Sequence, residues 1–239
     1  MKTFSIPKLP FSREETLSPR ALVAIVLLSV ICVRAHEYSH IAAVVLQGGA
    51  FTTTFGLVYP SGDNHVVTFI AGPLLTYVVL WTGLVLLLTS HNGSRSGFEL
   101  IAATMPLLRM VGRVFPHIPG RDELFISRTL HIADPIAAAI VWGIVVPPVV
   151  FAYFSIDSRF RTRWFLFFFV ALPLISMIVV LGLGDFYILG IAKSHLFAGT
   201  PLAAKFHGIP VVVLFCDAAV VTSFLFVSRL NRQSTNSLL

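Results

Sequence analysis

Residues 21–47 read ALVAIVLLSVICVRAHEYSHIAAVVLQ, a long apolar run with few polar side chains. As a helix this run is about 40 Å long at ~1.5 Å per residue, which is enough to cross a membrane with some tilt. It contains His36, Glu37 and His40 within five residues. Titratable groups inside a membrane helix are rare and mark functional sites. The run therefore predicts a membrane helix that carries the chemistry of the protein.

The spacing of these three residues predicts a metal site. His36 and His40 are four residues apart, so on a helix both imidazoles lie on one face and can bind one metal ion. Glu37 lies one residue further round, where it can reach water at that ion, as in zinc hydrolases. We therefore predict one zinc ion per chain, with Glu37 as the catalytic base. The structural alternative is a buried pair of histidines bonded to neighbouring helices, with Glu37 paired to Arg34.

The composition is that of a membrane protein. Of 239 residues, 56% are hydrophobic and only 12% are charged, whereas a soluble domain carries about twice that charge. The apolar runs predict an all-α polytopic protein with about six transmembrane helices. These runs cover 21–47, 66–89, 98–112, 133–154, 164–184 and 209–228. We expect a multi-pass integral membrane protein, in the cytoplasmic membrane if the source is prokaryotic.

Charge and cysteine content narrow the function classes further. The net charge of +6 lies mostly in short flanks and loops, which is typical of membrane topology and lipid headgroup contact, and we expect no nucleic-acid partner. Cys32 and Cys216 both lie within predicted membrane segments. They are therefore interpreted as small core residues and not as a disulfide.

The predicted organisation has three parts. Residues 1–20, with four basic residues and three prolines, predict an interfacial arm. Residues 21–230 form the membrane domain, with its core in 21–125 and additional helices in 133–230. Residues 231–239 are polar and predict a disordered tail.

The segment after the first helix has β character. Gly48 and Gly49 are expected to end the helix, and residues 51–59 read FTTTFGLVY, rich in β-branched and aromatic residues. We predict a short strand or hairpin near the active site, where an extended substrate can pair with a strand edge. A structured loop on the membrane surface is the alternative.

The second predicted span contains Gly72 followed by Pro73. Counting from the shared loop at 48–64, His40 and Gly72 lie at similar depth in antiparallel neighbours. A proline in a helix removes one backbone donor and frees the carbonyl four residues earlier. The exposed backbone beside the metal predicts substrate binding at Gly72 and Pro73, and a simple packing kink is the alternative.

A catalytic zinc needs a further protein ligand beyond two histidines, commonly a carboxylate. Asp122 on the turn PHIPGRDE at 116–123 is the best candidate, because an odd number of spans returns this segment to the side of the 48–64 loop. Glu123 is the second candidate. The structural alternative for Asp122 is an N-cap of a helix that begins near Glu123. Asp134 precedes Pro135 and predicts a helix cap with proline in the first turn.

Asp217 is an acid inside the last predicted span. Such a group needs a partner or water in the membrane. We expect it to pair with His207 or to line a water path.

With these residues the chain resembles a known family, the site-2 proteases. These are polytopic zinc metalloproteases that cut within membrane segments. The likeness rests on His36-Glu37-x-x-His40 in one membrane helix, Ala71-Gly72-Pro73 in the next, and Asp122 after a proline-rich turn. It covers roughly residues 21–125.

The resemblance implies that the two histidines and Asp122 bind zinc and that Glu37 acts on water. It also implies a substrate contact at Thr76, although the family usually has an asparagine three residues after the proline of this motif. The family motif also ends in Asp-Gly, whereas Glu123 follows the aspartate here.

The sequence thus predicts hydrolysis of a peptide bond in or near a transmembrane segment of a membrane-protein substrate, as in regulated intramembrane proteolysis. The bilayer and a regulatory membrane protein are further expected partners. The main alternative is a transporter or channel in which His36, Glu37, His40 and Asp217 relay protons or bind a transported metal. Haem ligation fits less well, because axial ligands lie on opposite sides of the ring whereas the two histidines share one face.

Overall fold

The computed structural model describes residues 19–54, 58–61, 66–89, 94–114, 122–159, 161–188, 190, 200–201 and 204–236. The expected N-terminal arm, apart from its last two residues, and the Pro/Gly-rich turn before Asp122 lie outside these ranges. The chain divides into two compact units, one with Pro73–Pro173 and the other with Ser18–Gly72 and Leu174–Leu239. The units divide inside two helices, between Gly72 and Pro73 and between Pro173 and Leu174.

Long apolar helices dominate the described residues, as the composition predicts. Five of the described helices are long and apolar enough to cross a membrane, which indicates a membrane protein. They cover Leu22–Leu46, Val66–Thr89, Asp134–Ser155, Arg161–Gly184 and Val211–Leu230.

The third expected membrane span is not a single helix in the structure. The range 98–112 falls on two short helices, α3 (Ser94–Ala103) and α4 (Pro106–Val114). They are separated at Met105, which has a φ of 52°. Pro106 explains the break, because proline disfavours helical backbone in the residue before it and is well tolerated as the first residue of a new helix. This range is therefore not one continuous span.

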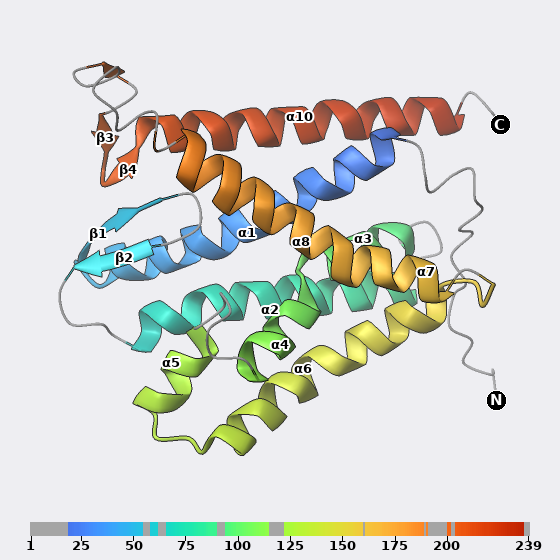
Figure 1. The fold of residues 1–239 in the computed structure, drawn as a ribbon, viewed down its shortest axis with the longest axis horizontal. Helices are drawn as coiled ribbons and strands as arrows, with labels where there is room; N and C mark the ends of the chain where they lie inside the picture. The colour runs from blue at the N-terminus through green and yellow to red at the C-terminus, as the bar shows by residue number, and fades with distance from the viewer. Residues whose placement is uncertain are drawn as a thin grey trace. The chain divides into compact units, whose positions relative to one another are not determined.

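In the unit Ser18–Gly72 with Leu174–Leu239, helix α1 (Pro19–Leu46) runs alongside helix α10 (Val211–Asn236) (Figure 1). Val30 of α1 packs into a small apolar cluster with Val180, Val212 and Val213. Helices α8 (Leu172–Met177) and η2 (Ile178–Ile188) precede α10 in the chain. Because α10 continues to Asn236, most of the range predicted as a disordered tail is helical.

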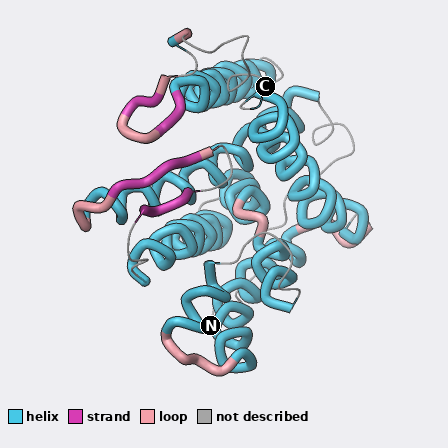
Figure 2. The backbone as a smooth tube through the Cα atoms, turned by 60° about the vertical axis from the view of Figure 1, so that its left-hand side comes forward, coloured by secondary structure: helices cyan, strands magenta, loops and turns pink. Residues whose placement is uncertain are grey.

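The same unit holds two short hairpins, shown in magenta in Figure 2. Strands β1 (Ala50–Thr53) and β2 (Val58–Ser61) are antiparallel, with Ala50 opposite Ser61. The strand or hairpin expected at 51–59 is thus present as a hairpin. Gly48, with a φ of 71°, ends α1 as predicted. The second hairpin pairs β3 (Lys205–Phe206) with β4 (Ile209–Pro210) through a turn at His207 and Gly208, both with positive φ.

The unit Pro73–Pro173 holds the larger part of helix α2 (Val66–Thr89), then α3, α4, α5 (Asp122–Thr129), α6 (Asp134–Ser155), α7 (Arg161–Leu166) and η1 (Phe167–Ala171). Asp134 is the first residue of α6 and Ala133 is its N-cap. The predicted cap at Asp134 is therefore wrong by one residue, although the helix does begin there with Pro135 in its first turn.

Helices α2 and α3 meet through glycines, as close-packed membrane helices often do. A Cβ added to Gly97 would lie 2.5 Å from the backbone oxygen of Gly83 and 2.9 Å from the Cα of Leu87. Both neighbours are backbone atoms, which cannot move aside without separating the helices. We therefore expect Gly97→Ala to lower the free energy of unfolding in detergent by about 1–3 kcal/mol.

The matched control for this prediction is Gly143→Ala in α6, where an added Cβ would meet no atom within 4 Å. That variant should gain up to about 1 kcal/mol from helix propensity. Equal stability of the two variants would contradict the close packing of α2 on α3.

Candidate metal centre

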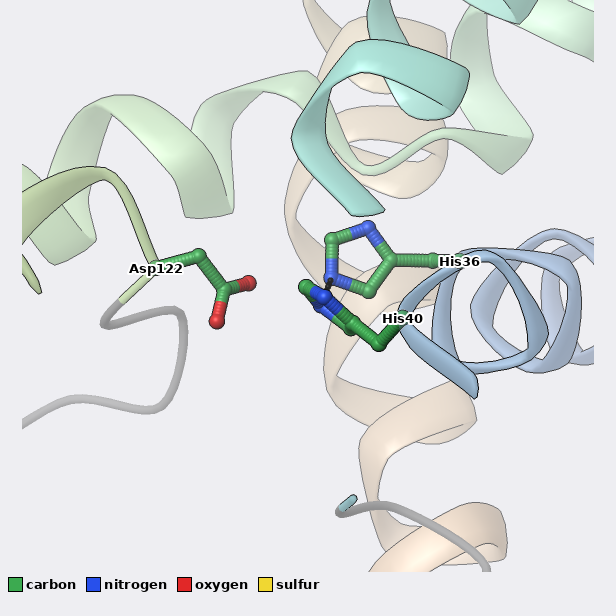
Figure 3. Close-up of side chains that lie close together, drawn as sticks. All are labelled: His36, His40 and Asp122. Atoms are coloured by element: carbon green, nitrogen blue, oxygen red, sulfur yellow. Dashed lines mark hydrogen bonds between the residues drawn. The ribbon is translucent and has the colours of Figure 1, made fainter. Parts of the chain in front are cut away.

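His36 and His40 lie on adjacent turns of α1, and their side chains meet (Figure 3). Both residues are only 5% exposed. Their Nε2 atoms are 3.2 Å apart, and the ring planes are nearly perpendicular, at 86°. The predicted convergence of two imidazoles from one helix face is present in the structure.

A hydrogen bond to α2 fixes the tautomer of His40. Its Nδ1 lies 2.6 Å from the backbone oxygen of Thr68. A carbonyl can only accept, so Nδ1 carries the proton, and the lone pair is on Nε2, which faces Nε2 of His36. An Nδ1–H bonded to a backbone carbonyl is a common way to orient a histidine that binds a metal.

The spacing of the two Nε2 atoms fits a single zinc ion. Two nitrogens at 2.0–2.1 Å from a tetrahedral zinc are separated by about 3.4 Å. The 3.2 Å between the Nε2 atoms of His36 and His40 is close to that value. The pair can therefore act as a two-point ligand with little rearrangement.

Gly72 of α2 lies directly against the two rings. A Cβ at this position would be 2.5 Å from Cε1 of His40 and 2.6 Å from Cε1 of His36, and closer still to Nε2 of His40. The absence of a side chain is thus required for the imidazoles to occupy their present positions. Helix α2 continues without interruption through Pro73, so the expected opening of this helix is not seen. Substrate binding by Gly72, Pro73 and Thr76 stays a prediction.

Glu37 follows His36 on α1 and is buried, with 9% of its surface exposed. A buried acid in an apolar helix is costly unless it has a task or partners. Its place next to the histidine pair is the one expected of a base that acts on water at the metal.

Asp122 and Glu123 form the first turn of α5, where acidic groups favour the positive end of the helix dipole. Nη1 of Arg109 lies 3.6 Å from Oδ2 of Asp122 and 3.3 Å from Oε1 of Glu123. The hydroxyl of Tyr77 also donates to Oε1 of Glu123, at 2.9 Å. Arg109 thus pairs with both candidate carboxylate ligands. Helix α5 begins at Asp122 itself, one residue before the start that the N-cap alternative expects.

His36 and His40 offer two ligand atoms for a metal ion. Asp122 belongs to the other compact unit, and its role as the third ligand stays a prediction. Two imidazoles with one carboxylate are a common ligand set of catalytic zinc.

No protein-family model, curated protein or solved structure matches this chain. Its function must therefore be argued from its own residues.

The structure also shows a polar network that the sequence did not predict. Asp217 of α10 accepts hydrogen bonds from Arg34 and from the hydroxyl of Tyr38, both on α1. The expected pairing of Asp217 with His207 is wrong, since His207 lies exposed in the β3–β4 turn with its ring against Phe206. An arginine in a membrane helix does indicate that an acidic partner exists, but the sequence does not say which acid it is.

Proposed function

We propose that the chain is an intramembrane zinc metalloprotease similar to the site-2 proteases. The observation that carries the proposal is the buried histidine pair of α1, with Nε2 atoms 3.2 Å apart and a buried glutamate between them in sequence. Burying three titratable side chains in an apolar helix is expensive, and a metal-dependent reaction gives all three a role.

Each of these side chains has a separate role in the proposed reaction. His36 and His40 would hold the metal through Nε2, and the backbone oxygen of Thr68 keeps the ring of His40 oriented. Bound zinc would polarise the scissile carbonyl and acidify the attacking water. Glu37 accepts the proton of that water and transfers it to the leaving amine.

Asp122 is proposed as the third ligand. The support is chemical, because a catalytic zinc held by two histidines commonly takes a carboxylate as its third protein ligand. Asp122 precedes Glu123 and keeps 22% of its side chain exposed, whereas Glu123 is 8% exposed and already holds Tyr77. Asp122 can therefore give up its ion pair with Arg109 and bind a metal ion more easily than Glu123 can.

The proposed substrate is a transmembrane segment of another membrane protein. A helical segment hides its carbonyls in internal hydrogen bonds, so it must become extended before hydrolysis. The β1–β2 hairpin follows the metal-binding helix in the chain and offers backbone groups for an extended strand.

The test uses purified protein in liposomes with a panel of single-span reporter proteins. We expect mass spectrometry to find cleavage in or next to the apolar segment, loss of cleavage after zinc chelation, and recovery on adding zinc. Zinc and proton flux are measured in the same vesicles. Flux that is lost in His36→Ala, without cleavage of any reporter, would contradict the protease proposal and favour the transporter alternative.

A further inference from the structure

Arg34 places a charged side chain inside the first apolar helix, with only 4% of the residue exposed. Its Nε lies 2.8 Å from Oδ1 of Asp217 and its Nη2 lies 3.0 Å from Oδ2. This is the two-point pairing of guanidinium and carboxylate, the stronger kind of ion pair. The Asp217 side chain is 15% exposed, so the pair is shielded from water on both sides.

Two further bonds extend the pair. The hydroxyl of Tyr38 donates to Oδ2 of Asp217 at 2.6 Å, and the guanidinium of Arg34 lies 5.0 Å from the centre of the Tyr38 ring. Nη1 of Arg34 donates to the backbone oxygen of Thr54, just after strand β1, at 3.3 Å. The network therefore joins α1, α10 and the end of β1, all within one compact unit.

Arg34 and Tyr38 lie on the opposite side of α1 from the metal-binding pair. Residues four apart share a helix face, and a step of two residues turns the helix by about 200°. Each of the two network residues on α1 is therefore about 160° from a histidine two residues later. Any rotation of α1 that moves Arg34 away from Asp217 also swings the imidazoles away from Thr68 and Gly72.

Apolar packing alone specifies this rotation poorly. The apolar residues of α1 are distributed around its whole circumference, without a single apolar face. A helix that is apolar all round can turn about its axis with little loss of buried apolar contact. A buried ion pair can be made in one orientation only, and its loss would leave charges unpaired.

We propose that Arg34, Tyr38 and Asp217 are positioning residues that fix the rotation of α1 about its axis. They thereby hold His40 on the backbone oxygen of Thr68 and both imidazoles against Gly72. Their effect on catalysis rests on the proposed zinc protease function. Their effect on the orientation of His40 does not, and it can be measured without metal.

The test replaces the network by apolar side chains in the triple variant Arg34→Met, Tyr38→Phe, Asp217→Leu. Replacing a buried ion pair by apolar groups of similar size often leaves stability unchanged, so this variant should fold. The matched control is Arg95→Met with Glu99→Leu, which removes an exposed ion pair of α3. Asp217→Asn, which keeps the shape of the side chain, serves as a second variant if the triple variant does not fold.

Two properties are measured. Zinc affinity, by competition with a chelating dye, should fall by about 10–100-fold in the triple variant and stay at the wild-type value in the control. In metal-free protein with ¹⁵N-labelled histidine, NMR should show His40 protonated at Nδ1 in the wild type and a mixture of ring tautomers in the triple variant.

The outcomes separate this proposal from the proposed function. A folded variant whose His40 tautomer matches the wild type would overturn the positioning role, whatever its zinc affinity. Wild-type protein without zinc affinity would overturn the zinc protease proposal, while a changed His40 tautomer in the triple variant would still support positioning.

Discussion

Glu37→Gln is expected to keep its zinc and to cleave reporter substrates about 10²–10⁴-fold more slowly than the wild type. The amide has nearly the same shape as the carboxylate, so the histidine pair on either side of it in the sequence should not move. It cannot accept a proton from water at neutral pH, and general base catalysis contributes a factor of this size. Cleavage rate and zinc content are measured on the same detergent-purified sample.

The control for this variant is the same glutamate-to-glutamine change at Glu99. Glu99→Gln alters a partly buried carboxylate of α3 that pairs with Arg95, and it should cleave at the wild-type rate. A Glu37→Gln variant with wild-type turnover would rule out Glu37 as the base. Loss of zinc together with activity would instead indicate a structural role for Glu37.

Gly72→Ala is expected to lower zinc affinity by about 100-fold or more while the protein stays folded. The new methyl group would lie 2.5 Å from Cε1 of His40 and 2.6 Å from Cε1 of His36. Imidazole rings end flexible side chains, so they can turn away and relieve the contact. The fold would survive, with a gain of up to about 1 kcal/mol in helix propensity, but the two Nε2 atoms would no longer converge.

Gly143→Ala is the matched control, since it makes the same change in an apolar helix where no atom lies within 4 Å. It should keep wild-type zinc affinity. Unfolding midpoints of both variants are measured beside the affinities. Wild-type zinc affinity in Gly72→Ala would contradict the position of the histidine pair against α2.

The sequence was sufficient for the features that depend on local spacing. The separation of four residues between His36 and His40 implies a shared helix face, and the structure confirms it. Substrate binding at Gly72 stays a prediction. The structure shows that α2 is helical through Pro73 and that the missing side chain of Gly72 makes room for the imidazoles.

Features that depend on the packing of distant segments could not be predicted. Arg34 and Asp217 are 183 positions apart, and no pattern in the sequence indicates that α1 runs beside α10. The prediction of a third span over 98–112 was wrong for a local reason. The mean hydropathy of these residues does not reveal the break that Pro106 causes at Met105.

The proposed zinc site of α1 is tested by elemental analysis of detergent-purified protein, with wild type compared to His40→Ala and Asp122→Ala. We expect about one zinc ion per wild-type chain and loss of zinc in both variants. Loss in His40→Ala alone would move the third ligand away from Asp122, with Glu123 next to be tested. Absence of zinc from the wild type, even after zinc is resupplied, would contradict the proposed zinc site.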